Sequence, residues 1–333
     1  MPGPVRRVLV LGDANVDLLL HVPARLADGR REVREPVVAP GGTAANTARA
    51  LAALGVPVAF AGAVGDDAFG RRVAADFAAL GVDTAGLLVT RDADTCQVIA
   101  LLEADGERSL VVWPPDGGAL RLLRPEDVSA EAVAGAAWLH TTGMCLRDAP
   151  VRDAVLHAMS LARSAGVPVS IDLNLRLELW GLDAERGAVV ARAIALADVV
   201  LGSGPEELVP LAAALSVGGA EVGAADDAAD PVERAARHLA ACTRTVVARL
   251  GGVGVLACAP DGSVLRSRAF EVDVANIIGA GDAFNAGFVA AMVEGRGLAE
   301  ALRWGNAVAA RKVARAVGAR DLPTRSEVEA LLA

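Results

Sequence analysis

The sequence contains no tyrosine, and its only lysine is Lys312. A P-loop ends in Gly-Lys-Ser/Thr, and a protein kinase requires a lysine on a strand. Lys312 has neither context, because the surrounding run AVAARKVARAVG (307–318) has a helical pattern. The sequence therefore excludes these two kinds of nucleotide site and disfavours Schiff-base chemistry.

Cysteine and histidine are scarce and scattered. The four cysteines form no CxxC pair, and the four histidines lie far apart in the sequence. Because local zinc motifs depend on closely spaced Cys and His ligands, a zinc site of that kind is disfavoured.

Long apolar runs are missing as well. Gly, Asp or Arg interrupts each run well before the ~18 residues that indicate a membrane-spanning helix. Near the amino terminus, Asp13 and Asp17 directly follow a short apolar run, and no small-residue cleavage site ends it, unlike a signal peptide. We expect a cytoplasmic protein with reduced thiols and no membrane partner.

The balance of charge is acidic, with 41 Asp and Glu against 32 Lys and Arg and a net charge of -9. Nucleic-acid binders need a basic face to displace counterions from phosphates, so we expect no nucleic-acid partner. Hydrophobic residues make up 53% of the 333 residues and charged residues 22%, which indicates a large buried core. We expect a single domain spanning residues 1–333 that binds small molecules.

Short β-branched runs alternate with amphipathic stretches along most of the chain, as in VRRVLVLG, TAANTARALAALG and VPVAFAGAVG. This βαβ rhythm predicts an α/β fold with a parallel sheet covered by helices on both faces. Residues 17–40 and 95–113 break the rhythm with extended patterns around Asp-Gly turns, which predicts a small second sheet. The Gly/Ala/Asp-rich residues 216–230 are interpreted as a solvated loop without a function.

The most informative segment is NIIGAGDAFNAGF, in which Gly279, Ala280 and Gly281 precede a predicted helix. Backbone N–H groups at such a helix start can hold an anion against the positive end of the helix dipole. Asp282 would repel that anion, unless its carboxylate takes a proton from a hydroxyl that attacks the anion. The alternative is that Asp282 only caps the helix.

Two further glycine-containing segments lie elsewhere in the chain. Gly41 and Gly42 allow a close approach of backbone to a ligand, and Asn46 in the next helical turn suits vicinal hydroxyls. The run RLGGVG, Arg249 to Gly254, joins a strand to a hairpin as a loop covering an adenine would, although GxxG by itself is a weak signal.

With these motifs in order, the sequence resembles the ribokinase-like (PfkB) carbohydrate kinases from about Val8 to Pro323. The shared motifs are GGTAAN, GDDAFG, the run Asp172 to Arg176, GAGDAF and the tail NAVAARKVARAVGA. The resemblance implies a three-layer α/β/α sandwich with a mostly parallel central sheet and a small β lid. It also implies ATP, Mg²⁺, phosphoryl transfer to a sugar hydroxyl, and a homodimer formed through the lid.

The resemblance also implies roles for single residues. Asp282 matches the catalytic base, and the backbone of Gly279, Ala280 and Gly281 matches the anion hole. Asp17, Gly42 and Asn46 match the sugar site, whereas Asp17 taken without the family would be read as an exposed charge. On the nucleotide side lie Asn174, Ser203, Glu206, Arg249, Gly251, Gly254 and Asn306. Of these, Glu206 would hold Mg²⁺ through water, and Asn306 could equally be a surface amide of a helix.

Two departures from the family pattern concern cations. Ser203 stands where the family usually has the asparagine of Asn-x-x-Glu, a motif that ends here in Glu206. Asn276, Ile277 and Ile278 stand where the family usually has Asp-Thr-Thr. Because hard cations are held by oxygen count and ligand charge, the loss of the carboxylate at Asn276 puts the family's monovalent-cation site in doubt.

We expect an ATP-dependent sugar kinase. The run DLNLRLELW, with Arg176, is similar to 2-keto-3-deoxygluconate kinases and some fructokinases, whereas GDANVD looks more like ribokinases. Arg176 could meet a substrate carboxylate or the ATP phosphates. The alternatives are a nucleoside kinase of the same fold and a non-catalytic sugar-binding regulatory protein. An NAD-dependent dehydrogenase is disfavoured, because no GxGxxG follows the first strand.

Overall fold

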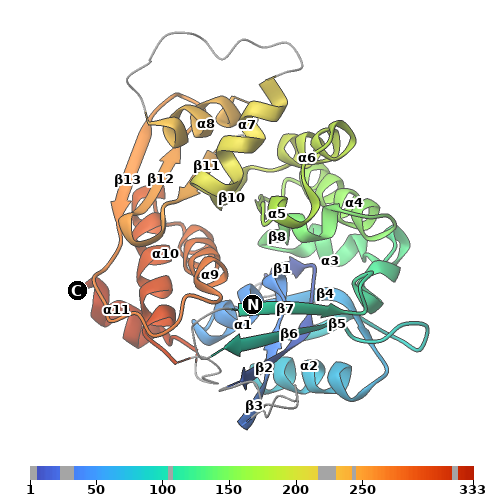
Figure 1. Ribbon diagram of the computed structural model, residues 1–333. Helices are drawn as coiled ribbons and strands as arrows, with labels where there is room; N and C mark the ends of the chain where they lie inside the picture. Colours follow the sequence, from blue (N-terminus) through green and yellow to red (C-terminus); the bar gives the residue numbers. More distant parts are fainter. Residues whose placement is uncertain (1–5, 23–33, 104–107, 217–229, 242–244, 317–321) are drawn as a thin grey trace, which may run out of the picture.

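A nine-stranded sheet forms the centre of the protein in the computed structural model (Figure 1). The structure describes residues 6–22, 34–103, 108–216, 230–241, 245–316 and 322–333. The strand order is β13-β12-β11-β10-β9-β8-β1-β4-β5, and all neighbours are parallel except the antiparallel pairs β11-β12 and β12-β13. The strands are β1 (Val8–Leu11), β4 (Val58–Gly65), β5 (Asp83–Thr90), β8 (Trp138–Thr142), β9 (Val169–Asp172), β10 (Val199–Ser203), β11 (Thr245–Arg249), β12 (Gly254–Cys258) and β13 (Val264–Arg268).

Helices cover both faces of this sheet and enclose two hydrophobic cores. Successive residues of a strand point to opposite faces, so Val8 and Val10 of β1 enter one core and Leu9 and Leu11 the other. The Val8 core is shared with α1 (Thr43–Ala53), α2 (Ala68–Ala79), α9 (Ala280–Val293), α10 (Leu298–Val313) and α11 (Arg325–Leu332). The Leu9 core is shared with α3 (Ala130–Gly135), α4 (Val151–Ser164), α6 (Ala184–Leu196), α7 (Val209–Ser216) and α8 (Pro231–Ala240). The expected α/β/α sandwich is confirmed.

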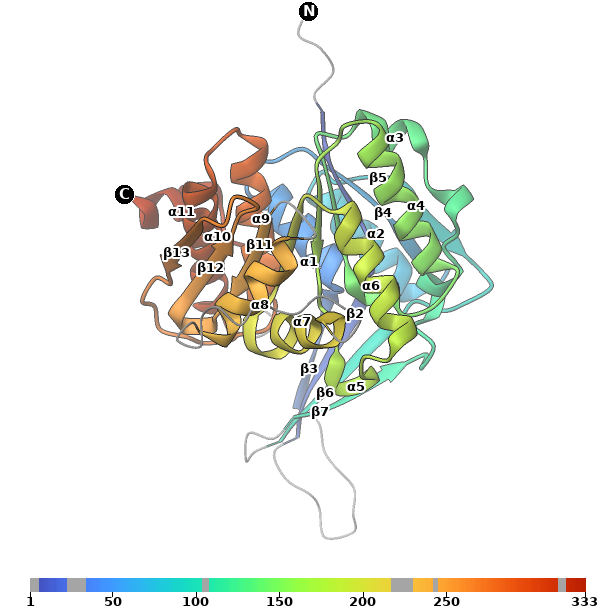
Figure 2. The ribbon, with the colours of Figure 1, turned by 90° about the horizontal axis from the view of Figure 1, so that it is seen from above.

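The two segments with extended patterns form a separate four-stranded sheet, as expected. Its order is β3-β2-β6-β7, with β2 (Asn15–Val22), β3 (Arg34–Gly41), β6 (Gln97–Glu103) and β7 (Arg108–Trp113). The pairs β2-β3 and β6-β7 are antiparallel, and β2 pairs with β6 in parallel. Figure 2 shows this lid sheet projecting from one side of the molecule. The Asp-Gly turns of both hairpins and most of the 216–230 loop lie outside the described residues.

The described helices include none that is long and apolar enough to cross a membrane. α9 has a mean hydropathy high enough to be buried on most sides, and it lies between α1 and α10. Because α9 begins at Ala280, this packing fixes the place of the GAGDAF segment relative to the sheet.

His140 is a fully buried titratable residue in the middle of the sheet. Its Nδ1 lies 2.8 Å from Ser170 Oγ, which also accepts a hydrogen bond from the Trp138 indole at 2.7 Å. Nε2 is buried without a hydrogen-bond partner among the described residues. Burial therefore lowers the pKa of His140 to about 4, with Arg249 adding to the decrease and Asp172 opposing it.

We predict that His140 makes the fold sensitive to acid. Between pH 6.5 and about 4 the unfolded chain binds the proton and the folded chain does not. The free energy of unfolding should thus decrease as the pH falls through this range, by about 3 kcal/mol for this one group. Denaturant unfolding of the wild type and His140→Phe at several pH values measures this contribution as a difference, in which the carboxylates common to both proteins cancel. Two parallel stability curves would contradict the prediction.

Candidate active site

A cavity of about 390 Å³ opens at the carboxyl ends of the central strands, beneath the lid sheet. Parallel sheets commonly place ligand sites at this edge. The cavity brings together the following predicted site residues: Asp17, Gly42, Asn46, Asn174, Arg176, Arg249, Gly279, Ala280, Gly281 and Asp282. Leu19, Val98, Ala100 and Leu110 of the lid close one side of it.

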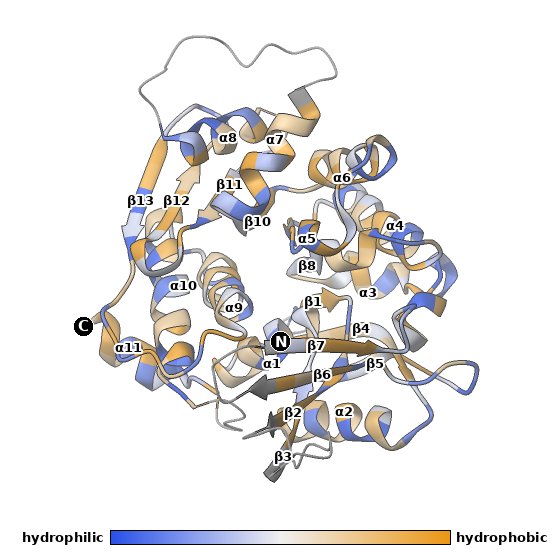
Figure 3. Ribbon diagram, in the orientation of Figure 1, coloured by the Kyte–Doolittle hydropathy of each residue, from blue (hydrophilic) through white to orange (hydrophobic). Residues whose placement is uncertain are grey.

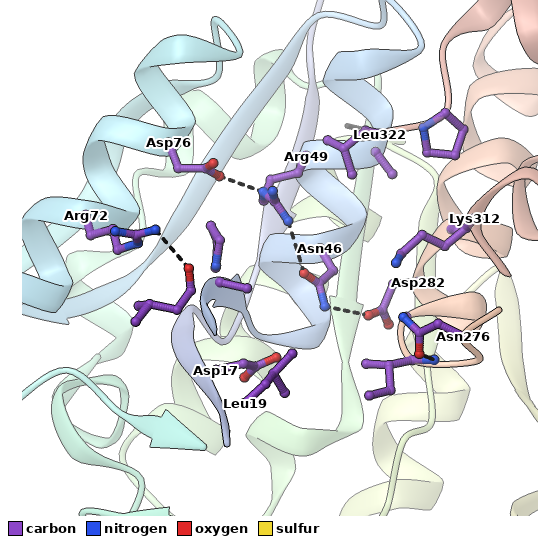
Figure 4. Close-up of a pocket in the computed structure, with 18 of the residues that line it drawn as sticks. Asp17, Leu19, Asn46, Arg49, Arg72, Asp76, Asn276, Asp282, Lys312 and Leu322 are labelled. Carbon is purple, nitrogen blue, oxygen red and sulfur yellow. Dashed lines mark hydrogen bonds and ion pairs between the residues drawn. The ribbon is translucent and has the colours of Figure 1, made fainter. Parts of the chain in front are cut away.

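A second cavity of about 350 Å³ adjoins the first and shares Asp17, Asn46 and Asp282 with it. Figure 4 shows these three side chains around this second cavity, with Lys312 near Asp282. Asp17 comes from the lid and Asn46 from α1. The predicted sugar residues and the predicted base therefore face one another across common space.

Asp282 lies in the first turn of α9, three residues after the left-handed Gly279 that caps the helix. Its Oδ2 accepts a hydrogen bond from Asn46 Nδ2 at 2.9 Å (Figure 4). The structure thus gives Asp282 a partner on another helix, and no side chain forms the cap of α9. This arrangement favours a chemical role for the carboxylate over the alternative of a simple helix cap.

Asp282 has a strongly perturbed acidity. Burial is the main reason that its pKa is raised to about 7, and the negative charges of Asp172 and Asp13 act in the same direction. The hydrogen bond from Asn46 and the positive charge of Arg249 oppose the increase. A carboxylate that titrates near neutral pH is a suitable general base for a hydroxyl.

One of the three backbone amides expected to form the anion hole already has a hydrogen-bond partner. The N–H of Ala280 donates to the carbonyl of Ile277 at 3.2 Å, so this amide already has a partner within the turn. The N–H groups of Gly281 and Asp282 belong to the first turn of α9, where amides have no carbonyl four residues earlier in the helix. These two amides are the better candidates to hold an anion.

Asp17 extends from β2 into the cavity and accepts a hydrogen bond from Asn15 Nδ2 at 2.8 Å. Burial raises its pKa to about 6, helped by the nearby charge of Asp13 and opposed by Asn15 and Arg49. Asp17 is therefore not the exposed charge that its sequence position alone would indicate. Its carboxylate is placed to accept hydrogen bonds from ligand hydroxyl groups.

Asp13 is a buried site residue that the sequence reasoning missed. Its carboxylate accepts the N–H groups of Thr43 at 2.7 Å and Ala44 at 3.1 Å, and so caps α1 from outside the helix. The helix needs this because its own N-cap residue, Gly42, has no side chain and adopts a φ of 97°. The sequence signal that could have identified Asp13 is an aspartate two residues after the end of a buried parallel strand.

The loop after β9 contains both non-glycine residues with positive φ among those described, Asn174 at 32° and Arg176 at 48°. Such backbone conformations are uncommon outside glycine and concentrate at functional sites. Asn174 Nδ2 donates to Thr43 Oγ1 at 2.5 Å, which fastens the loop to the start of α1. The exposed Arg176 borders the cavity and lies close enough to Asp13 to oppose the increase in the pKa of that carboxyl, which burial raises.

Glu206 is not the acidic residue that faces the site. It is exposed, whereas Glu207 is buried and accepts the N–H groups of Leu175 at 2.7 Å and Ser203 at 2.8 Å. The reason is that residues Gly204–Leu208 form a π-helix, which contains more residues per turn than the spacing Asn-x-x-Glu assumes. Glu207 and not Glu206 is thus the buried acid of this segment, and the metal role expected for Glu206 stays a prediction.

The remaining nucleotide-side residues lie outside the lining of the cavity. Gly251 and Gly254 flank the exposed turn between β11 and β12. Asn306 is buried, and its Nδ2 donates to the carbonyls of Ser267 and Arg268 in β13, so it is not a surface amide. Its role toward a nucleotide stays a prediction.

Asn276 is buried beside the turn that leads into α9. Its Oδ1 accepts the N–H of Ile278 at 2.9 Å, and its own N–H donates to the carbonyl of Val313. The one side-chain oxygen that could replace the usual carboxylate is therefore engaged in shaping the turn.

Comparison with known proteins now gives the family. The profile of the pfkB family carbohydrate kinases matches residues 5–325. The chain belongs to this family. It is accordingly an enzyme, a phosphotransferase that acts on carbohydrates.

Several curated kinases are similar to the chain over nearly its whole length. A 5-dehydro-2-deoxygluconokinase of Shouchella clausii is 28% identical, covering 98% of this chain and 95% of its own. An ATP-dependent ribose-1-phosphate kinase of Halopiger xanaduensis is 32% identical and covers 98% of both. A probable fructokinase-4 of Arabidopsis thaliana is 32% identical, covering 89% and 88%. These relatives act on different sugars and so do not define one substrate.

Solved structures agree with the fold. A fructokinase of Xylella fastidiosa with bound ATP has a TM-score of 0.82 at 28% identity, covering 98% of each chain. A putative ribokinase II of E. coli in complex with ATP and Mg²⁺ also has a TM-score of 0.82, at 22% identity, with 98% and 99% covered. The second likeness concerns the fold alone.

We predict that Asp282→Asn reduces turnover by at least ~100-fold, the usual scale for the loss of a general base. The fold and ATP affinity should be kept, because asparagine can retain a hydrogen bond with Asn46. In the wild type, kcat/KM should rise with pH through about 7, since the base must first lose its proton. Steady-state kinetics and ATP titrations measure both effects. Near-normal turnover of the variant would return Asp282 to a structural role.

Proposed function

We propose that this kinase transfers the γ-phosphoryl group of ATP to a hydroxyl of a monosaccharide or sugar acid of the 2-keto-3-deoxygluconate, fructose or ribose type. The observation that carries the proposal is the Asp282 carboxylate, placed at the start of α9 and facing Asp17 and Asn46 across shared space. The relatives named as kinases of a keto sugar acid, fructose and ribose 1-phosphate support this range of substrates.

Each group in the site has a separate role in the proposed reaction. Asp17 accepts hydrogen bonds from sugar hydroxyls, and the sugar then presents one hydroxyl to Asp282. Asp282 takes the proton of that hydroxyl as its oxygen attacks the phosphoryl group. The N–H groups at the start of α9 stabilise the negative charge on the transferring group, because the helix dipole and the amides point the same way.

The residues present fit ATP with Mg²⁺. The described residues hold no group of three or more His, Cys, Asp and Glu able to bind a metal by themselves. Mg²⁺ does not require such a group, because it is usually coordinated by phosphates, waters and one or two carboxylates. Glu207 would hold such waters, and the ion would neutralise charge on the phosphates when bound.

We predict that a substrate panel will identify the sugar. ADP release should be measured with ribose, fructose, 2-keto-3-deoxygluconate and nucleosides. If an acidic sugar is preferred, Arg176→Ala should raise its KM at least ~10-fold, as loss of a charged hydrogen bond would, and leave the KM for ATP nearly unchanged. The reverse pattern would assign Arg176 to the triphosphate. Nucleosides as the only acceptors, or no turnover with any member, would overturn the proposed function.

We also predict little or no activation by K⁺. Asn276 has one side-chain oxygen and no negative charge, and that oxygen already accepts the N–H of Ile278. Initial rates at fixed ionic strength in K⁺ and in a large organic cation test this. A stimulation of several-fold would show that backbone oxygens suffice for a cation site.

A homodimer through the lid remains part of the proposal. Four successive residues of the edge strand β7 are between 44% and 53% exposed, although they are Leu110, Val111, Val112 and Trp113. Figure 3 shows the apolar character of this strand. An exposed apolar edge strand favours pairing, and a second lid is the occupant that the family resemblance implies.

The proposed location is the cytoplasm. The described cysteines, Cys96, Cys145 and Cys258, are free thiols, and burial raises the pKa of each. Buried neutral thiols of this kind are compatible with a reducing compartment.

A further inference from the structure

A closed group of buried polar side chains lies directly beneath the first turn of α9. Arg249, at the end of β11, donates from Nη2 to Asp172 Oδ1 at 2.7 Å and from Nη1 to Asn285 Oδ1 at 2.8 Å. Asn285 Nδ2 donates to the other oxygen of Asp172 at 2.8 Å, which completes a triangle. Asp172 is 2% exposed and Asn285 is fully buried.

These three hydrogen bonds fix the position of the first turn of α9, which carries Asp282. Asn285 lies on α9 three residues after Asp282, on the neighbouring turn of the same helix. The guanidinium also lies close to Gly281, because a Cβ added at that position would be 3.4 Å from Arg249 Cζ. Arg249 therefore joins the start of α9 to the ends of β9 and β11.

The same guanidinium is the positive charge among several carboxylates. Glu207 Oε2 lies 4.0 Å from Arg249 Nη2, so the buried group holds two acidic residues against one arginine before Asp282 is counted. Burial and the charge of Asp172 raise the pKa of Glu207, and Arg249 opposes this. The charged side chains that line the two cavities together with Asp282 are Asp13 from the loop after β1, Asp17 from β2, Asp172 from β9, Arg176 from the loop after β9, Arg249 from β11, Arg49 from α1, Arg72 and Asp76 from α2, and Lys312 from α10.

Both terminal nitrogens of Arg249 are already engaged with protein oxygens. In a phosphate-binding arginine, these two terminal nitrogens usually donate their hydrogen bonds to the ligand. The arrangement therefore differs from the nucleotide-loop role that the family resemblance implies for Arg249.

We propose that Arg249 is a positioning residue for the catalytic base: its hydrogen bonds to Asp172 and Asn285 fix the first turns of α9, and its positive charge offsets the carboxylates that surround Asp282. This inference rests on the proposed role of Asp282 as the base. The effects of the charge of Arg249 and of its hydrogen-bond geometry can be measured separately. Lysine keeps the charge without the planar guanidinium, and methionine removes both.

The experiment compares Arg249→Lys, Arg249→Met and the double variant Arg249→Met/Asp172→Asn with the wild type. Arg91→Met is the matched control, since it removes an arginine whose ion pair with Asp66 lies on the surface. The pKa of Asp282 is read by NMR from ¹³C-labelled aspartate carboxyls, with the signal assigned through Asp282→Asn. This readout needs no turnover, so it decides the inference even if the panel of sugars gives no activity.

In Arg249→Met the pKa of Asp282 should increase by about 1 unit or more above the wild-type value, and Asp17 should move less. At pH 7 kcat/KM should fall about 5-fold and recover at higher pH, with the KM for ATP unchanged. The double variant should return the pKa of Asp282 toward the wild-type value, because a positive and a negative neighbour are lost together. Arg249→Lys should keep that pKa and lower kcat at every pH. Arg91→Met should change neither.

Three results would overturn the inference. The first is an Asp282 pKa that is the same in Arg249→Met and the wild type. The second is a lower melting temperature with an unchanged kcat and pH profile, which would make Arg249 structural only. The third is a raised KM for ATP that lysine restores, which would make Arg249 a phosphate ligand. If Arg249→Met does not fold because Asp172 is left buried without its partner, Arg249→Lys decides. A lower kcat at every pH with an unchanged KM for ATP supports the inference, and a wild-type kcat overturns it.

Discussion

The structure has to accommodate several carboxylates at one edge of a parallel sheet. Because parallel strands end together, Asp13 after β1 and Asp172 at the end of β9 lie near Glu207 and Asp282. Buried charges are costly unless each finds a partner. Here backbone amides bind Asp13 and Glu207, Asn46 binds Asp282, and Arg249 binds Asp172. These contacts join the strand ends to α1 and α9.

The same burial that is costly for stability gives Asp282 the acidity that its proposed role requires. A carboxyl in water titrates too low to take a proton from a hydroxyl efficiently, whereas burial raises the pKa of Asp282 to about 7 and that of Asp17 to about 6. The site therefore combines groups that would be destabilising elsewhere. Proteins commonly accept such local conflicts at functional sites and compensate them with the surrounding packing, here the two cores on either face of the sheet.

Sequence patterns predicted the architecture well because they are local. Alternating strand and helix periods gave the α/β sandwich, and the two extended segments with Asp-Gly turns gave the lid sheet. The GAGDAF motif located Asp282 at a helix start, since small residues before a helix are visible without any long-range contact. Local spacing did not show which acid of the next segment is buried: in the π-helix at Gly204–Leu208 it is Glu207, and Glu206 is exposed.

The sequence by itself thus determined the fold class, the lid, the family and the position of the expected base. Only the tertiary structure decided which partners set the properties of that base. Arg249 is separated from Asn285 by 36 residues and from Asp172 by 77, and no periodicity or motif links them. Their hydrogen bonds exist because β9 and β11 end at the same edge of the sheet on which α9 begins. Such contacts depend on the packing of whole elements, and hence on the folded chain.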